Sequence, residues 1–590
     1  MGFTKPDLPE VVPEEYLALP LQERLAISTH RWVDYGFGTA KIFFLIYAIK
    51  LVFFYALPGI IITTATSGLH FWEVDTWWDQ PIIYQKLIIW TMFLESLNLA
   101  GAWGPLTNKF KPWTGGFRFW SRTGTIRLRP WTWVPGTAGT TRTPLDVGMY
   151  FLFLISLVVA LVAPGGELED SAPHRLIDPK LLIAPLVLIC LIGFRDKVVF
   201  LASRAEQYVP ALLIFAILPY ASFATMIVAG KLLIVVVWVG AGLSKVGLHF
   251  VNVIPVMVSN SPMLPWKSLR RANYRNYPND LRPSKLARFM ADILGAIGEI
   301  AVPILLLFSV NRTLTVVGVV FMICYHLFII STFPLAVPLE WNLLFIYISI
   351  ILFVGFPAGD GYSVVDMNPP WLILVIFAML IFFPVLGNIR PDKVSFLPSL
   401  RQYAGNWAVG LWAFAPGAED KLNRLTKRPI PPLIDQLEAI DVPREWGEVI
   451  GDFGLSWRAM HSQGRGVYST MMRFVQDIDL RRIREGEVMS GICTGFNFGD
   501  GHLHDENMIA AVQEQVRFDP GDVMIVWAES QPITRFEQDF KIIDPAVGVL
   551  AKGTWSVRDC VNAQPWLPDG PIPLNITWTS DPKRFPLGVS

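Results

Sequence analysis

The stretch WVGAGLSKVGLHF, residues 238–250, lies inside an apolar run that extends over residues 232–258. A run of about 18 or more apolar residues is typical of a helix that crosses a membrane. This run nevertheless contains a lysine, Lys245, and a histidine, His249, near its middle. Charged residues inside a membrane usually face the interior of a helix bundle, where they meet a partner. The stretch therefore predicts a helical membrane protein with a polar site inside the membrane.

The composition of the whole chain agrees with the membrane class. Of its 590 residues, 52% are hydrophobic and only 17% are charged, and the mean hydropathy is +0.42. That is too apolar for a soluble protein of this length. The formal net charge is zero, which gives no reason to expect a nucleic-acid partner. The N-terminal residues lack the basic start and the apolar core of a signal peptide, so we expect no cleaved segment.

The apolar runs predict about ten membrane-spanning helices. They begin near Lys41, Lys86, Val147, Leu181, Tyr208, Leu232, Phe289, Thr313, Trp341 and Trp371. Two loops, residues 103–146 and 259–288, each contain seven lysines and arginines, whereas the alternate loops are acidic. Basic residues accumulate in cytoplasmic loops. Ten helices with both termini in the cytoplasm satisfy this pattern, so we expect a multi-pass protein of the inner (plasma) membrane that contacts membrane lipids.

The predicted fold class is a polytopic α-helical membrane protein with a C-terminal cytoplasmic α+β or mostly-β domain. Residues 1–40 form a cytoplasmic or interfacial segment, in which residues 10–30 resemble an amphipathic helix resting on the inner surface. Residues 41–390 form the transmembrane domain. Residues 391–425 are an interfacial linker, because the segment LRQYAGNWAVGLWAFAPG is rich in tryptophan. Residues 426–590 form the soluble domain, with strand-like stretches such as DVMIVWAES.

Ionisable residues in the sixth to eighth apolar runs predict a common site. Lys245 and Glu299 each fall near the middle of their runs, at about 1.5 Å of rise per residue. Because consecutive helices are antiparallel, we expect Lys245 to lie opposite Glu299 and His249 to point towards Asp292. His326, on the following helix, falls close to the same level. Packing alone explains any one of these residues, but bases and acids that converge from three consecutive helices favour a functional polar site.

A second pair of ionisable residues lies in the first two runs. Lys50 and Glu95 each fall near the middle of helices that one short loop connects. We interpret them as a structural ion pair that locks these helices together, with a contact between Glu95 and the substrate as the alternative.

Part of the chain resembles a known membrane domain. The resemblance covers about residues 200–340 and is to the horizontally transferred transmembrane (HTTM) domain, the membrane core of vitamin K-dependent γ-glutamyl carboxylase and its bacterial relatives. The matching pieces are an AG-x-x-K segment with Ala241, Gly242 and Lys245, an aromatic residue at Phe250, the acidic helix EIAVPILLLF from Glu299, and Tyr325 with His326. Over its whole length the chain is also similar to a family of actinobacterial transmembrane proteins to which no activity is attached.

The resemblance implies a chemistry for the polar site. It implies that Lys245 is the base that acts on a reduced naphthoquinone, and that His326 stabilises an oxyanion or a ring oxygen. Menaquinone or another prenyl lipid would then be the ligand. Nothing in the chain matches the propeptide-binding or luminal glutamate-binding regions of the carboxylase, which leaves peptide carboxylation unsupported.

A separate histidine cluster lies in the soluble part. The segment GFNFGDGHLHDEN places Asp500, His502 and His504 beside Asp505 and Glu506. Alternating histidines can reach one metal ion, with a carboxylate as a third ligand. The alternative, which we favour, is a turn followed by Asp505 as the cap of a helix that begins at Glu506.

Two functions follow from these patterns. The first is a membrane-embedded enzyme that acts on a lipid or quinol, with Lys245 as base, with His249, Glu299 and His326 as its catalytic partners, and with Glu95, Asp292 and Tyr325 as substrate contacts. The second is a lipid carrier or transporter, or an accessory subunit whose cytoplasmic domain binds a protein partner. Buried acids and bases suit proton-coupled transport as well.

Overall fold

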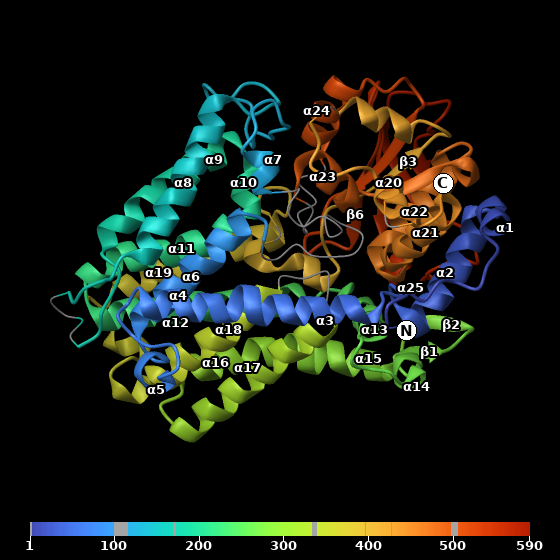
Figure 1. Cartoon of the computed structure of the whole chain (residues 1–590). Coiled ribbons are helices and arrows are strands. Elements are labelled where there is room, and N and C mark those ends of the chain that lie inside the picture. Colours follow the sequence, from blue (N-terminus) through green and yellow to red (C-terminus); the bar gives the residue numbers. More distant parts are fainter. Residues whose placement is uncertain are drawn as a thin grey trace.

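The computed structural model describes residues 3–99, 116–168, 171, 173–332, 339–395, 397–425, 427–439, 441–496 and 505–589. Figure 1 shows two parts, a bundle of long helices and a sheet that is surrounded by shorter helices. We call the bundle the helical region (residues 41–389) and the second part the sheet domain (residues 409–589). The N-terminus lies beside the sheet domain.

Six helical segments of the described residues are long and apolar enough to cross a membrane. They are α3–η1–α4 (Lys41–Ala65), α8 (Pro144–Val162), α12 (Phe223–Ser244), α15–η6–α16 (Lys285–Phe308), α17 (Arg312–Thr332) and α19 (Leu372–Ile389). The count rises to seven if the bent pair Glu340–Gly355 and Ala358–Asp366, which contains α18 (Leu339–Ile350) and η7 (Ile351–Gly355), is one crossing.

The prediction of about ten spans is therefore not confirmed. Three of the predicted spans form helices of 16, 13 and 13 residues, namely α6 (Pro81–Ser96), α9 (Ile183–Arg195) and α11 (Ala205–Ile217). A crossing needs about 20 residues. Nearly all side chains of α6 are buried by neighbouring helices. An apolar run in the sequence does not give the length of the helix that it forms.

α12 is the central helix of the bundle. Of its most apolar window, 78% is buried, compared with 17% for Lys41–Ala65 and 22% for α19. The side chain of Ser222 caps its first turn by accepting a hydrogen bond from the Thr225 N–H. A helix that is apolar on all sides is stable only where other elements or lipid surround it, and in α12 other elements do so.

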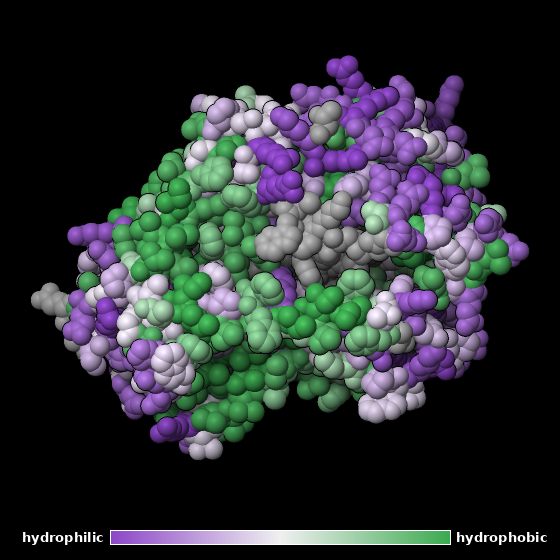
Figure 2. Space-filling view, viewed as in Figure 1, coloured by the Kyte–Doolittle hydropathy of each residue, from purple (hydrophilic) through white to green (hydrophobic). Residues whose placement is uncertain are grey.

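The surface of the molecule reflects the same division. Figure 2 shows apolar residues gathered over α8 and α9 and along α3 (Lys41–Lys50), whereas polar residues cover the sheet domain. The exposed side chains of α8 include Leu152, Ile155 and Val159. Contiguous apolar surface of this extent is the expected surface of a protein that contacts lipid.

The sheet domain contains one seven-stranded sheet in the order β4–β3–β5–β6–β7–β8–β9, with every neighbouring pair antiparallel. The strands are β3 (Val409–Phe414), β4 (Arg482–Glu485), β5 (Val523–Ala528), β6 (Glu537–Asp544), β7 (Gly548–Ser556), β8 (Leu574–Thr579) and β9 (Gly588–Val589). The helices are α20 (Leu433–Glu438), α21 (Arg444–Met460), α22 (Ser462–Phe474), α23 (Gly486–Thr494), α24 (Glu506–Val516) and α25 (Val557–Asn562).

The tryptophan-rich segment contributes a strand to this sheet rather than lying only in a membrane interface. β3 pairs with both β4 and β5, and all six of its residues are buried. Trp412 packs into the core that is continuous with the helical region, whereas Leu411 packs on the opposite face against α22. Because both faces of β3 are covered, all its residues are apolar, and the strand forms a continuous apolar run in the sequence. The sequence alone does not distinguish such a run from a segment in the membrane interface.

The N-terminal helices pack on the sheet domain. α1 (Pro13–Ala18) and α2 (Leu21–Tyr35) both contact α21. Arg24 of α2 forms a buried ion pair with Asp452 of α21, and Leu25 joins the core of the sheet domain. The apolar face of α2 is therefore covered by protein, and the placement of this helix on the inner membrane surface stays a prediction.

Short elements complete the chain between these parts. They are α5 (Val74–Trp77), α7 (Phe117–Trp120), α10 (Lys197–Ala202), α13 (Val253–Asn260), α14 (Lys267–Arg271) and the two-stranded hairpin β1 (Tyr274–Asn276) with β2 (Asp280–Pro283).

Candidate functional site

The apolar run that contains Lys245 is not one continuous helix. α12 ends at Ser244, and Lys245 is the first residue beyond its end. The chain then forms a short turn of helix, η5 (Phe250–Asn252), before α13 begins at Val253. The uninterrupted apolar run predicts that Lys245 lies at the middle of a span. In the structure Lys245 lies at a helix break instead.

Close packing of α12 against α16 (Gly298–Phe308) brings the site together. A Cβ atom on Gly242 would lie 2.6 Å from Ile300 Cγ1 and 3.2 Å from the carbonyl oxygen of Ala296. A larger residue at Gly242 would displace the Ile300 side chain and crowd the backbone beside it. Small residues at helix contacts of membrane proteins permit this close approach, and here it places Lys245 beside Glu299.

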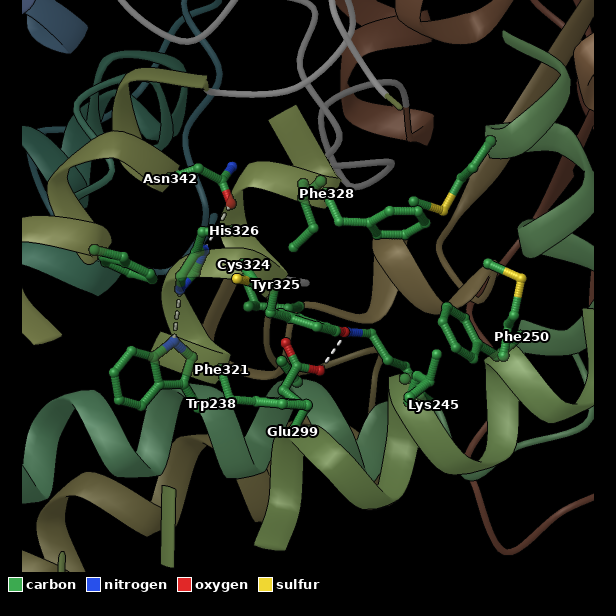
Figure 3. Close-up of a pocket in the computed structure, with 18 of the residues that line it drawn as sticks. Trp238, Lys245, Phe250, Glu299, Phe321, Cys324, Tyr325, His326, Phe328 and Asn342 are labelled. Carbon is green, nitrogen blue, oxygen red and sulfur yellow. Dashed lines mark hydrogen bonds and ion pairs between the residues drawn. The ribbon is translucent and has the colours of Figure 1, made fainter. Parts of the chain in front are cut away.

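Lys245, Glu299 and Tyr325 form a buried polar cluster (Figure 3). The Lys245 ammonium forms an ion pair with the Glu299 carboxylate and donates a hydrogen bond of 3.0 Å to the Tyr325 hydroxyl. The rings of Phe250 and Tyr325 flank the ammonium, with centroids 5.5 and 5.4 Å from Nζ. The predicted contact between Lys245 and Glu299 is thus present, and Tyr325 of α17 joins it.

His326 lies on the opposite side of the same cavity from Lys245 (Figure 3). Its Nε2 accepts a hydrogen bond of 3.1 Å from the Trp238 indole N–H, and its Nδ1 lies 2.9 Å from Asn342 Oδ1. An indole only donates, so the ring hydrogen is on Nδ1 and points to Asn342. Both ring nitrogens of His326 are therefore engaged by neighbouring side chains.

These groups line a cavity of about 290 Å³ between α12, η6–α16, α17 and α18. The remaining lining residues are almost all apolar or aromatic: Ala241, Phe250, Ile254, Met257, Met290, Leu294, Gly295, Phe321, Cys324, Phe328, Ile329, Trp341, Phe345 and Leu400. An apolar cavity of this size with a few converging polar groups is typical of a binding site for a small molecule.

His249 and Asp292 do not belong to this cavity. His249 is buried but faces the sheet domain, where it contacts Ser462 and Gln531. Burial lowers the pKa of His249 to about 4. Asp292 is exposed on η6 (Met290–Ile297). The predicted approach of His249 to Asp292 is wrong for two reasons. α12 ends before His249. In addition, η6 is a π-helix, in which the seven residues from Asp292 to Glu299 do not complete two turns, so these two acids do not share a face.

Lys50 and Glu95 do not pair with each other. Lys50 Nζ lies 2.7 Å from Glu340 Oε1, and Glu95 contacts Arg204 at 3.2 Å and accepts a 3.2 Å hydrogen bond from Tyr208. Neither residue lines the cavity. Arg204 and Glu340 each lie just before an apolar run, where a charge is unremarkable, so the sequence does not single them out. Glu340, directly before Trp341, is the feature of the sequence that could have indicated a second acid as a partner for Lys50.

The histidines of the metal hypothesis, His502 and His504, lie outside the described residues, as does Asp500. Asp505 does cap α24, where its side chain accepts hydrogen bonds from the N–H groups of Asn507 and Met508. His461 is buried against aromatic rings and hydrogen-bonds the Trp457 carbonyl, and burial lowers its pKa to about 3. Within the described parts of the chain, no cluster of three or more metal-ligating side chains is present.

Comparison with known proteins gives a family but no activity. No curated protein and no solved structure matches the chain. A family model described as a transmembrane protein of unknown function (DUF3556) matches residues 1–577. The several long apolar helices of the structure agree with that description. The chain belongs to this family of transmembrane proteins.

Proposed function

We propose that the protein is a membrane-embedded enzyme that binds a lipid or quinol in the cavity, with the reacting hydroxyl group at Lys245. The observation that carries this proposal is the position of the Lys245, Glu299 and Tyr325 cluster in the wall of an otherwise apolar cavity. An apolar body and a single polar attachment point suit a prenyl lipid or a quinol. The resemblance to the HTTM domain supports the same class of ligand.

The lysine and the glutamate can act as one base. An ammonium has three hydrogens, and Glu299 and Tyr325 take two of those of Lys245, which leaves one for a ligand oxygen. If Lys245 passes a proton to Glu299, the neutral amine can accept the proton of a ligand hydroxyl. The result is an oxyanion held by the Lys245 ammonium, with the proton on Glu299. The low dielectric of the apolar cavity strengthens that attraction.

A ligand dissolved in the bilayer can reach this cavity from the side. Leu294 of η6 and Cys324 of α17 line the cavity and are also exposed at the surface. We propose that the cavity opens between these two helices. The neighbouring exposed residues on the same helices, Ile297 and Leu327, are apolar. We propose that the opening faces lipid.

The arrangement of the termini supports one topology. Because α2 packs on α21, the N-terminal segment and the sheet domain lie on the same side of the membrane, which requires an even number of crossings. We propose the inner (plasma) membrane with both termini in the cytoplasm, as the basic loops predict.

A lipid carrier or an accessory subunit is the second candidate. The observation that favours it is that the four predicted catalytic residues are not all available for catalysis. His249 lies outside the cavity and both nitrogens of His326 are engaged. A cavity that only binds a lipid needs no further reactive group. A carrier would retain the lipid unchanged, whereas an enzyme would convert it.

The proposal predicts that a lipid is lost when Lys245 is replaced. We expect mass spectrometry of an organic extract from the purified wild-type protein to detect a prenyl lipid or quinone, and the Lys245→Met variant to lose it. Lys231→Met is the matched control, because Lys231 is a buried lysine of the same helix that donates to the Tyr362 carbonyl and does not line the cavity. Identical extracts from all three folded proteins would refute the site.

A further inference from the structure

His249 joins the broken end of α12 to the sheet domain. Its Nδ1 lies 2.8 Å from the Ser462 hydroxyl at the start of α22, and its Nε2 lies 2.9 Å from Gln531 Oε1 in the segment after β5. An amide oxygen only accepts, so Nε2 carries the hydrogen and the Ser462 hydroxyl donates to Nδ1. The buried His249 therefore forms a hydrogen bond to the sheet domain with each of its two ring nitrogens.

The partner Gln531 is itself held in place. Its backbone N–H donates to Asn406 Oδ1, and its carbonyl oxygen accepts from Asn406 Nδ2. Each of these hydrogen bonds is 2.7 Å long. Its side-chain Nε2 donates a hydrogen bond of 2.9 Å to the Pro532 carbonyl. Gln531 thus presents Oε1 to His249 from a fixed position.

A second contact holds the same break three residues later. Arg465 of α22 is fully buried and donates a 3.0 Å hydrogen bond to Asn252 Oδ1. Its other hydrogens are used inside the sheet domain, where it donates to the carbonyls of Met460, Cys560, Val561 and Ala563. Asn252 is therefore tied to the part of the sheet domain that Arg465 organises.

The held segment also contains residues of the cavity. Lys245 precedes His249 by four residues, and Phe250 follows it directly. Phe250 lines the cavity, and its ring flanks the Lys245 ammonium. Because α12 ends at Ser244, the regular hydrogen bonds of a helix do not fix this segment, and side-chain contacts take over that role.

We propose that His249 is a positioning residue through which the sheet domain sets the positions of Lys245 and Phe250, and thereby the shape of the ligand cavity. This inference rests on the proposed function, because the shape matters only if the cavity holds a ligand. It also gives the sheet domain a defined role in binding. A change at Ser462 or Gln531 alters ligand retention although neither residue lines the cavity.

The test measures hydrogen exchange and ligand retention on the same full-length protein in nanodiscs. Ser462→Ala combined with Gln531→Met removes both partners of His249. We expect amide exchange of residues 245–253 to rise at least about fivefold, since each lost hydrogen bond contributes about 1 kcal/mol. We expect the apolar molecule retained per protein, quantified by mass spectrometry, to fall by a similar factor.

Two variants serve as controls. Ser456→Ala removes an equally buried hydroxyl that donates only within α21, to the Phe453 carbonyl, and should leave both readouts at wild-type values. Ser462→Thr keeps the hydroxyl and, in the presence of Gln531, should retain the ligand as the wild type does.

The outcomes separate this inference from the proposed function. Unchanged exchange of residues 245–253 in the double variant would overturn the positioning role, and so would faster exchange with full ligand retention. If the wild type retains no apolar molecule, the proposed function fails, and the exchange arm alone then decides whether the sheet domain positions this segment.

Discussion

Replacing Glu299 with leucine is expected to lower the free energy of unfolding by about 3–5 kcal/mol, because it leaves the Lys245 ammonium buried without its counter-ion. Only 7% of Lys245 and 4% of Glu299 is exposed, so water cannot replace the lost partner. Tyr325 remains as a hydrogen-bond acceptor, but a neutral hydroxyl does not balance a full charge. The measurement is unfolding by sodium dodecyl sulfate in mixed micelles, followed by tryptophan fluorescence.

The double variant Lys245→Met with Glu299→Leu tests whether the loss of stability in Glu299→Leu comes from the unpaired Lys245. Replacing a whole buried ion pair by apolar residues of similar volume is often neutral or stabilising. We therefore expect the double variant to regain most of the stability that Glu299→Leu loses. If the double variant is as unstable as the sum of the two single losses, Lys245 and Glu299 do not act on each other.

Replacing Gly464 with alanine is expected to destabilise the sheet domain by about 3 kcal/mol or more, through overpacking. A Cβ atom at Gly464 would lie 1.7 Å from the Arg458 carbonyl oxygen and 2.4 Å from its carbonyl carbon. These are backbone atoms at the end of α21, so they cannot rotate away as the end of a side chain can. The start of α22, which carries Ser462, would have to move. Thermal unfolding of the purified protein measures the loss.

Gly451→Ala is the matched control on the neighbouring helix. Its Cβ atom would make ordinary contacts, 3.6 Å from Leu433 Cδ2 and 3.8 Å from Arg484 Nη1. Since alanine is favoured over glycine inside a helix by roughly 0.5–1 kcal/mol, this variant should be neutral or slightly stabilising. Equal stability of the Gly464 and Gly451 variants would contradict the close packing of α21 against α22.

The sequence predicted the membrane class and the central contact of the site for physical reasons. Long apolar runs have few other uses in proteins, so they identify membrane helices well. Lys245 and Glu299 could be paired because consecutive antiparallel helices bring equal depths together. Gly242 permits the close approach that this pairing needs. His326 could be placed at the same level by its depth in the following run, and both His326 and its neighbour Tyr325 line the cavity.

Other features depend on the path of the backbone, which an apolar pattern does not reveal. The break after Ser244 turns His249 away from the cavity, and the π-helix η6 carries Asp292 to the surface. Lys50 selects Glu340, a residue 290 positions further along the chain, rather than Glu95 in the next helix. Such long-range choices follow from how the helices pack. Neighbouring positions in the sequence do not determine them.

A cryo-electron microscopy map of the protein, extracted from its own membranes into nanodiscs, tests the binding site most directly. We expect an elongated density in the cavity between α12, α16 and α17, with one end within hydrogen-bonding distance of Lys245 Nζ, and we expect no such density in the Lys245→Met variant. A wild-type map that resolves the side chains of Trp238 and Tyr325 but shows an empty cavity would refute the proposed ligand site.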